Sequence, residues 1–521
     1  MDLATAISGR VGAPGDTFWL RGGNYPIGHI STTIHGAPGR TTTFRAMPGE
    51  KPRIDGSFTF FNSLGYVVVR DLEIFSSDTN RVSQQRGMGY HPTDINPVPG
   101  VASYAPNLSF INLIVHDQVG QGFYLSPDAS NDLVYGCIVF NNGWVSPDNA
   151  EGHNFYVQGD RGTREISENV AFNNCGANYH IYENASGGAL RGITLDGNVA
   201  FNAGALQRIR PYRDWVVGVD SPAIGADGIV LRNNMGYLAP GSPTLTQAQM
   251  GRDGLNGEIG LLDNYLPMGV LLNNWAVATC SGNVLAPRNA DYILDLQLAG
   301  DPFGFGIDYN TYCRPPTGND FRINTLPYDF PDWLEQFGFD WDSSHVVGSL
   351  TGPQVFVRSN RFERGRAHLI VYNWTHLSSV PVDVSSVLPL GTPYEVRNAQ
   401  DFFVPPVLTG TFDGQKLNLP MTGLTVAWPN GPFTAPPPTG PEFNVFELLP
   451  VQTRLRLSIA NGEARIFWLT NAGRYTVQFK DSLSVTSHWT SLTNRPNILG
   501  DNYFIRDSSY FRQRFYRLSS D

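Results

Sequence analysis

A short phrase recurs in the first half of this 521-residue sequence, and the repeat limits the folds that the chain can adopt. The phrase occupies residues 138–143, 170–175 and 199–204, so its copies are 32 and then 29 residues apart. Each copy alternates apolar and variable positions up to an aromatic residue and then reaches Asn, followed in each copy by a short turn-forming stretch. Alternation indicates a strand and Asn a turn, while periods of about 20 to 50 residues indicate a solenoid or array.

A second short strand recurs within the same repeats, at residues 122–125, 154–157 and 180–183. Coils that contain several short strands and no helical period stack as a parallel β-helix, in which each coil pairs with the next about 4.8 Å away. The aromatic position of the first phrase should then stack inside the coils, through Phe75, His116, Phe140, Phe172 and Phe201. We therefore expect His116 to be structural and not catalytic.

The composition fits a chain with a large buried core and many turns. Hydrophobic residues make up 41% and charged residues 16%, with 55 Gly and 37 Pro. The net charge of −10 argues against a nucleic-acid partner. No apolar run is long enough to span a membrane, and no signal-peptide pattern follows Met1. The four cysteines lack CxxC spacing, so we expect buried thiols and no metal site.

Residues 1–345 resemble the pectate-lyase-like right-handed parallel β-helix superfamily. The resemblance rests on the opening segments 14–25 and 47–56 and on the closing segments 305–312 and 338–344. It implies an all-β fold, action on a polysaccharide, and an extracellular or periplasmic location with the signal peptide absent from this sequence. We also expect a monomer. The superfamily hosts several chemistries, so the resemblance does not select one reaction.

The repeat ends near residue 346. Residues 346–450 contain short alternating strands separated by Pro and Gly, which predicts a small antiparallel β-sandwich as an accessory domain. Residues 451–521 predict a second, smaller β-sandwich domain. Its tryptophans Trp468 and Trp489 could stack on sugars, but positions in the domain core are the favoured interpretation.

An alignment of the later coils gives a column of acidic residues. The column consists of Glu183, Asp220, Asp263 and Asp295. Glycoside hydrolysis needs two carboxyl groups about 5 to 9.5 Å apart, a spacing that neighbouring rungs would supply. We take Asp220 and Asp263 as the first candidate pair and Glu183 as the alternative acid. The competing interpretation is that these residues cap turns at strand ends.

Aromatic and imidazole side chains precede the acidic column. Tyr124, Tyr156 and Tyr182 should face outward if Phe123 and Phe155 face inward, and such a ladder could bind sugar rings. Two histidines lie beside these strands and are candidates for a general base or a substrate donor, although loop histidines are often structural. These are His153 and His180.

Basic residues narrow the range of reactions. The chain has only three lysines, Lys51, Lys416 and Lys480, so an elimination that uses a groove lysine as base is disfavoured. Four arginines could bind the carboxylates of an acidic polymer, although solvation and ion pairing would also explain them. They are Arg208, Arg210, Arg213 and Arg252.

Three functions follow from these residues. The leading one is a glycoside hydrolase that uses paired carboxylates and no cofactor. The second is a lyase or epimerase acting on a uronate polymer, in which arginine, and calcium if present, neutralises the carboxylate while a His, Tyr or Arg removes the adjacent proton. The third is a non-catalytic glycan-binding surface protein that uses the tyrosine ladder alone.

Overall fold

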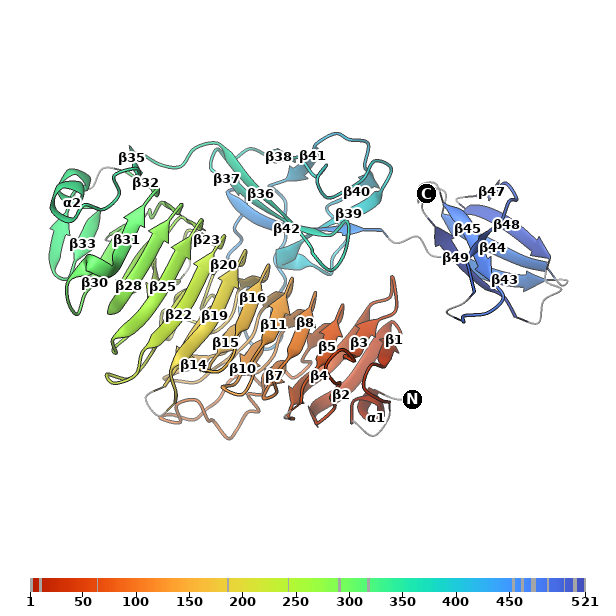
Figure 1. Cartoon of the computed structure of the whole chain (residues 1–521), viewed down its shortest axis with the longest axis horizontal. Helices are drawn as coiled ribbons and strands as arrows, with labels where there is room; N and C mark the ends of the chain where they lie inside the picture. Colours follow the sequence, from red (N-terminus) through yellow and green to blue (C-terminus); the bar gives the residue numbers. More distant parts are fainter. Residues whose placement is uncertain are drawn as a thin grey trace. The chain divides into compact units, whose positions relative to one another are not determined.

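The fold is a right-handed parallel β-helix followed by small antiparallel sheets, as the sequence predicted. We describe a computed structural model of the chain. It covers residues 3–8, 12–62, 64–184, 187–241, 243–288, 292–315, 319–451, 455–460, 463–469, 475–484, 487–500, 502–508 and 513–519. Among these residues, no helix has the length and apolar character needed to cross a bilayer. Figure 1 shows the coils stacked from the red N-terminal strands to the green ones.

Three ladders of parallel strands run along the β-helix, and most coils give one strand to each. The first ladder is an eleven-stranded sheet: β1 (Thr17–Leu20), β3 (Thr42–Ala46), β5 (Val67–Arg70), β8 (Leu108–Ile111), β11 (Asp132–Tyr135), β16 (Arg164–Ser167), β19 (Leu190–Asp196), β22 (Ala226–Arg232), β25 (Asn256–Leu262), β28 (Trp275–Ser281) and β31 (Phe305–Asp308).

The second ladder carries the candidate site. It contains β2 (Gly23–Thr32), β4 (Pro52–Phe60), β7 (Val101–Ser103), β10 (Phe123–Leu125), β15 (Phe155–Val157), β18 (Tyr179–Glu183), β21 (Trp215–Val219), β24 (Gln247–Met250), β27 (Gly269–Asn273), β30 (Leu294–Gln297) and β33 (Phe321–Ile323). Parallel pairing brings residues about 30 positions apart in the sequence onto neighbouring rungs.

The third ladder also begins from β4, whose first residues pair with β6. It contains β6 (Glu73–Phe75), β9 (Ile114–His116), β12 (Ile138–Phe140), β17 (Val170–Phe172), β20 (Val199–Phe201), β23 (Met235–Tyr237), β26 (Tyr265–Leu266), β29 (Val284–Leu285), β32 (Thr311–Arg314) and β35 (Ser344–Val347). The unit also contains α1 (Leu3–Ile7), the β13 (Trp144–Val145) and β14 (Ala150–Glu151) hairpin, η1 (Pro302–Gly304), β34 (Leu326–Tyr328) and α2 (Phe330–Phe337).

Stacked side chains hold successive coils in register. In the core behind the second ladder, the rings of Phe123, Phe155, Tyr179 and Trp215 follow one another with centroids 4.5 to 5.3 Å apart. At one turn, a buried amide ladder links each Asn side chain to the next. Its members are Asn169, Asn198, Asn234, Asn264, Asn283 and Asn310. Because buried amides need partners, each Asn satisfies its neighbour while it closes the turn.

The aromatic stack of the third ladder lies on the outer side of the coils, so its predicted place inside them is wrong. The stack forms as expected, with centroids 5.7 Å apart between Phe75 and His116 and 4.9 Å between Phe172 and Phe201. However, the neighbouring small residues, such as Ala200, belong to the core cluster. Strand alternation therefore turns the rings outward. Segment 425–443 covers the stack, and its Phe443 ring lies 5.2 Å from that of Phe201.

The residues divide by their contacts into two compact units, Met1–Gly352 with Thr425–Phe443, and Pro353–Leu424 with Asn444–Asp521. The second unit contains an antiparallel five-stranded sheet and a strand pair around a shared core. These are β36 (Pro353–Ser359), β37 (Ala367–Asn373), β42 (Phe443–Pro450), β39 (Pro393–Asn398) and β40 (Leu408–Thr411), with β38 (Ser379–Val382) and β41 (Leu417–Pro420). The predicted domain boundaries at residues 345 and 450 remain predictions.

The C-terminal residues of this unit form two further antiparallel sheets. The first contains β43 (Arg456–Ala460), β44 (Glu463–Leu469), β48 (Asn502–Ser508) and β47 (Asn497–Leu499). The second contains β46 (Thr490–Ser491), β45 (Thr476–Lys480) and β49 (Phe515–Ser519). Trp468 packs in the core here and is 2% exposed, which agrees with the favoured interpretation of this residue.

Candidate functional site

A row of rings projects from the outer side of the second ladder. Tyr124 pairs with Tyr156, and Tyr156 pairs with His180, not with Tyr182 as the sequence comparison assumed. Tyr182 follows two residues later, opposite Gly218. The alignment of the recurring sequence phrases placed the tyrosines at equivalent positions. In the structure Phe155 pairs with Tyr179, so the residue after it in each strand pairs as well, Tyr156 with His180. A shift of two residues preserves strand parity, so all three tyrosines still face outward.

The row is longer than the sequence indicated. Ring centroids lie 5.5 Å apart between Tyr124 and Tyr156, 5.2 Å between Tyr156 and His180, and 4.5 Å between His180 and Tyr182. Two further rings extend it toward the N-terminal coils, with Tyr104 5.5 Å from Tyr124 and Phe61 4.4 Å from Tyr104. We call this row the outer aromatic ladder: Phe61, Tyr104, Tyr124, Tyr156, His180 and Tyr182.

His180 occupies an unusual position within the ladder. Its Nδ1 atom is buried and has no hydrogen-bond partner among the described residues. Burial lowers the pKa of the imidazole well below its ordinary value, and the nearby His153, Arg252 and Arg210 lower it further. The ring is therefore neutral near pH 7 and keeps a lone pair that can accept a proton.

His153 supports His180 from below, with ring centroids 4.0 Å apart. The backbone N–H of Ala177 donates to Nδ1 of His153 over 2.8 Å, so the ring proton lies on Nε2. That atom faces the Glu151 carboxylate at 3.2 Å, and the Tyr212 hydroxyl donates to the same carboxylate over 3.2 Å. Both ring nitrogens of His153 are thus engaged, which fits a supporting role better than that of a free base.

Arg210 and Arg252 lie close enough to His180 to lower its pKa, and Arg213 lies near Arg252. Arg252 lies with its guanidinium carbon 5.2 Å from the Tyr182 ring centroid, and it influences the pKa values of His180 and Arg213. Arg210 lies over the Tyr212 ring at 4.7 Å and donates to the Asn149 side chain over 2.9 Å.

Arg213 is the least satisfied of the three. Its Nε atom is buried and has no hydrogen-bond partner in the described part of the chain. Burial lowers the pKa of its guanidinium, and the neighbouring charge of Arg252 acts in the same direction. A buried cation costs free energy unless an anion pairs with it. Arg210 and Arg252 already lie near carboxylates, Glu151 at 3.6 Å and Asp220 at 2.8 Å. Within the cluster of Arg210, Arg213 and Arg252, it is therefore Arg213 that favours an anionic ligand.

Arg208, the fourth predicted arginine, has a different environment. Its guanidinium donates to the carbonyls of Ala205 and Gln207, over 3.0 and 2.7 Å, within its own loop. These bonds shape the loop after β20, and no contact joins Arg208 to His180. Its predicted role in substrate binding stays a prediction.

The predicted column of four acids does not form. Asp263 follows β25 of the first ladder, whereas Asp220 follows β21 of the second. The sequence comparison missed β24, which supplies the next rung after β21 in the second ladder. Asp295 does lie on the second ladder, but three rungs beyond β21, where Arg322 pairs with it. Asp220 and Asp263 therefore cannot form the predicted pair.

Asp220 itself is engaged on both carboxylate oxygens. The Tyr182 hydroxyl donates to Oδ2 over 2.9 Å, and Arg252 donates from Nε to Oδ1 over 2.9 Å. The Arg252 Nη2 atom also lies 2.8 Å from Oδ1. This carboxylate orients Tyr182 and Arg252 at the edge of the outer aromatic ladder.

Glu183 lies behind the ladder and is only 2% exposed. Gln158 donates to its Oε1 over 2.8 Å and the Asn184 backbone over 3.1 Å, while Oε2 is buried without a partner among the described residues. Burial raises the pKa of this carboxyl above its ordinary value. The competing interpretation, a turn cap at a strand end, fits these contacts.

The tyrosines of the site remain protonated at neutral pH. Burial raises the pKa values of Tyr156 and Tyr182, and nearby carboxylates raise them further: Glu183 for Tyr156 and Asp220 for Tyr182. Their hydroxyls can therefore donate hydrogen bonds or a proton, but they are poor bases. Tyr212 and Gln158 were not predicted, although Tyr212 lies within the arginine-rich segment that the sequence singled out.

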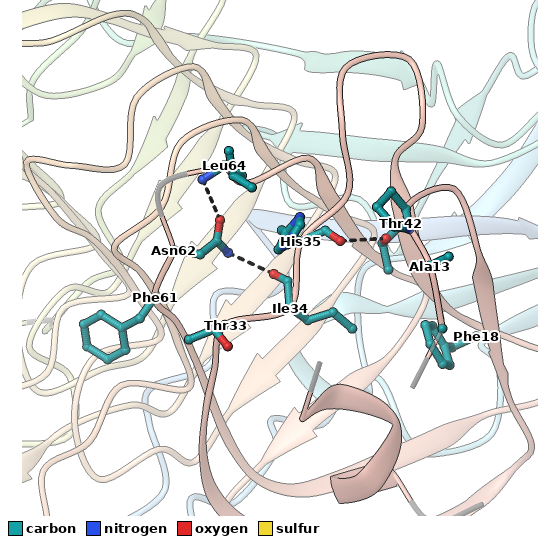
Figure 2. A pocket seen from close by; sticks show the side chains of 11 residues that line it. Ala13, Phe18, Thr33, Ile34, His35, Thr42, Phe61, Asn62 and Leu64 are labelled. Carbon is teal, nitrogen blue, oxygen red and sulfur yellow. Dashed lines mark hydrogen bonds between the residues drawn. The ribbon is translucent and has the colours of Figure 1, made fainter. Parts of the chain in front are cut away.

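A separate cavity lies in the first coils of the β-helix. It has a volume of about 460 Å3 and is lined by residues that include Phe18, His35 and Asn62. Figure 2 shows that the Asn62 amide donates to the Ile34 carbonyl and accepts from the Leu64 backbone. These bonds engage the Asn62 side chain within the protein. No residue of the arginine cluster lines the cavity, but Phe61, at the end of the outer aromatic ladder, does.

The described residues contain no group of three or more His, Cys, Asp or Glu side chains placed to hold a metal ion. The calcium ion that a uronate lyase could use therefore stays a prediction, without identified ligands in the described residues. The arginine cluster supplies positive charge at the site from the chain itself.

Comparisons with known proteins returned structures but no sequence relatives. No family model and no curated protein matches the sequence. A pectate lyase structure aligns with a TM-score of 0.37 and 11% identity, over 63% of this chain and 73% of the other. A mannuronic-acid-specific family 6 polysaccharide lyase from human gut microbiota gives 0.37 and 13%, over 61% and 80%. A tailspike protein of an E. coli bacteriophage, solved with a pentasaccharide, gives 0.28 and 9%, over 84% and 87%.

Proposed function

We propose that this protein is a lyase that cleaves an acidic polysaccharide by β-elimination at a uronate residue. One observation carries the proposal: a neutral histidine with a buried, unpartnered nitrogen lies beside arginines, one of which has a buried, unpartnered Nε. An anionic group bound by the arginines would bring an acidic C–H bond next to the imidazole. The proposed site consists of Tyr156, His180, Tyr182, Arg210, Arg213 and Arg252.

The reaction assigns one task to each type of side chain. The arginines bind the sugar carboxylate, and this lowers the pKa of the proton on the adjacent carbon. His180 removes that proton, and the electron pair forms a double bond as the neighbouring glycosidic carbon–oxygen bond breaks. A phenol hydroxyl, from Tyr156 or Tyr182, donates a proton to the departing oxygen. The products are an unsaturated uronate end and a new hydroxyl end, with no water consumed.

The electrostatics of the site support these assignments. A base must be unprotonated at the working pH, and the lowered pKa of His180 satisfies this condition. An acid must be protonated, and the raised pKa values of Tyr156 and Tyr182 satisfy it. Arg210 and Arg252 also help to keep His180 neutral before substrate binds. Once the arginines pair with the substrate carboxylate, their charge opposes protonation of His180 less.

Glycoside hydrolysis is the second candidate because of Glu183. Its raised pKa and unpartnered oxygen suit a general acid, and its backbone carbonyl accepts from Asp220 on the adjacent rung. Two features weigh against it. Glu183 is 2% exposed, whereas His180 as a residue is partly exposed. Asp220, the carboxylate next to Glu183, already binds Tyr182 and Arg252.

The test is product analysis on uronate polymers, such as polygalacturonate and alginate, alongside neutral glucans. A lyase produces ultraviolet absorbance from the unsaturated uronate together with new reducing ends. New reducing ends without absorbance would replace the proposal with hydrolysis. Binding without either product would favour the non-catalytic alternative. The predicted extracellular or periplasmic location and monomeric state can be checked on the same purified protein and its source cells.

A further inference from the structure

A second sugar-binding surface is indicated in the C-terminal part of the chain, around Trp489. This tryptophan is half-buried, in contrast to Trp468 in the core of the same region. The Nζ atom of Lys480 lies 5.3 Å from the centroid of the Trp489 ring, and the guanidinium carbon of Arg517 lies 4.5 Å from it. A single indole thus has two cations against it.

The strand register explains why these side chains meet. In β45, the buried Val477 points into the core, so Gln478 and Lys480 point to the other side. Arg517 of β49 pairs directly with Gln478, and its Nε donates to the Gln478 amide oxygen over 2.8 Å. Trp489 immediately precedes β46, on the opposite side of β45. We call Gln478, Lys480, Trp489 and Arg517 the tryptophan face.

The charge of this face is not balanced. In the described part of the chain, no carboxylate forms an ion pair with Lys480 or Arg517. The nearest acid in sequence to Lys480 is Asp481, and it pairs with Arg514 over 2.8 Å. On a chain with a formal net charge of −10, two cations beside an accessible indole form a local site of opposite sign.

We propose that the tryptophan face binds a chain of anionic sugars, with the indole stacking on a sugar ring and Lys480 and Arg517 pairing with carboxylates. Flat aromatic rings pack against the apolar face of sugars, and guanidinium groups bind carboxylates in two-point contacts. The Gln478 amide nitrogen donates one hydrogen to the Ser491 hydroxyl over 3.3 Å, and its second hydrogen is the donor for a sugar hydroxyl. The choice of uronate polymers as the partner rests on the proposed function, whereas the requirement for an anionic ring comes from the face itself.

The experiment measures binding of the full chain to polygalacturonate and alginate by affinity gel electrophoresis. All proteins carry His180→Asn, so that the polymer is not degraded during the run. We expect Trp489→Ala to weaken retardation about tenfold, because the variant loses the ring that packs against the sugar. The double variant Lys480→Ser with Arg517→Ser should weaken binding similarly, and added salt should reduce the difference between it and the parent. Trp341→Ala, at a 67% exposed tryptophan of the β-helix, is the control and should bind like the parent.

Equal retardation of the parent, the Trp489→Ala protein and the double variant would overturn the proposal. The double variant protects the test against misfolding of the tryptophan variant, since both cations are near the surface, and circular dichroism checks each protein. The two proposals fail separately. Binding that depends on Trp489 without lyase products from the unmutated protein overturns the proposed function and supports the tryptophan face. Lyase products with binding that ignores Trp489 do the reverse.

Discussion

Two histidines of the β-helix, His116 and His180, lie in similar rows of rings but in opposite electrostatic environments. His116 stacks between Phe75 and Phe140 on the third ladder, where its two nitrogens face Asp117 at 2.7 Å and Glu73 at 3.3 Å. Burial opposes a charge on this ring, but the two carboxylates outweigh it and raise the pKa of His116. His180 faces arginines instead, and its pKa is lowered.

The two rows of rings also differ in how far they are covered by other parts of the chain. Segment 425–443 closes the third-ladder stack, where its Asn430 backbone donates to Asp117 over 2.7 Å and its Phe433 ring lies 4.6 Å from the Arg81 guanidinium. The tyrosines of the outer aromatic ladder stay partly exposed. A repeated coil therefore builds ring stacks on both faces. Chemistry is favoured where the stack is open and buried atoms, here His180 Nδ1 and Arg213 Nε, have no partner among the described residues.

The largest expected effect on activity comes from replacing His180, the neutral histidine. His180→Asn should lower kcat on a uronate polymer about 10²- to 10⁴-fold, the usual contribution of a general base, with little change in the thermal midpoint. The unmutated protein should also retain activity below pH 6.5, because the pKa of His180 is lowered. Initial rates from ultraviolet absorbance across pH check both statements. Full activity in the variant would remove His180 from the mechanism.

A smaller loss of activity is expected when one arginine of the cluster is replaced. Arg213→Gln should reduce kcat/KM about 10- to 100-fold, because a hydrogen bond to a charged group contributes roughly 1.5–3 kcal/mol. The matched control is Arg232→Gln on the first ladder, where Arg232 pairs with Asp196 over 2.8 Å. We expect this control to behave like the unmutated protein. Equal kinetics for both variants would contradict the assignment of Arg213.

Replacing His116, the covered histidine, should lower stability and leave catalysis intact. His116→Phe keeps a ring in the stack but removes the contacts to Glu73 and Asp117, which should cost about 1–3 kcal/mol of unfolding free energy. Because the folded-state pKa of His116 is raised, its contribution is complete below its unfolded pKa and is lost as the pH rises through the folded value. Urea unfolding at pH 5 and pH 9 should therefore separate the two proteins more at pH 5. A larger difference at pH 9 would contradict the assigned charge.

The smallest effect is expected at the turns that connect the third ladder to the second. Asn142, Asn154 and Asn178 form an amide ladder that ends on Asp214, whose Oδ1 accepts from Asn178 and from the Ala203 backbone. The other oxygen is buried without a partner among the described residues, and burial raises the pKa of Asp214 to about 7.

The Asp214→Asn variant tests the contribution of this buried carboxyl to stability. With a raised folded-state pKa, Asp214 favours folding in acid and loses that contribution as the pH rises through about 7. Asparagine cannot ionise, so the variant should be more stable than the unmutated protein by about 1 kcal/mol above pH 7. The two proteins should match only below about pH 4, where the carboxyl is protonated in the unfolded chain as well. Unfolding curves at several pH values measure the difference. A variant that is less stable at pH 9 would show that ionised Asp214 has a favourable partner.

Sequence patterns predicted the repeating coils, the outward tyrosines and the stacked His116. The acid column failed at one particular place, because β24 carries no copy of the recurring phrase and an alignment by phrase skips it. The aromatic stack was assigned to the wrong side because a three-residue strand cannot show which parity faces the core. Tyr104 and Phe61 lie outside the repeated phrases, so the ladder seemed shorter than it is.

Local sequence fixed the coil, because strand alternation and Asn turns depend only on neighbouring residues. It also placed histidines, tyrosines and arginines on the same few coils. The register between coils decided which side chains meet. An alignment that is wrong by one strand assigns an acidic residue to the wrong ladder. The protonation states of His116 and His180 depended on long-range neighbours as well, because burial and nearby charge set a pKa and neither can be read from adjacent residues.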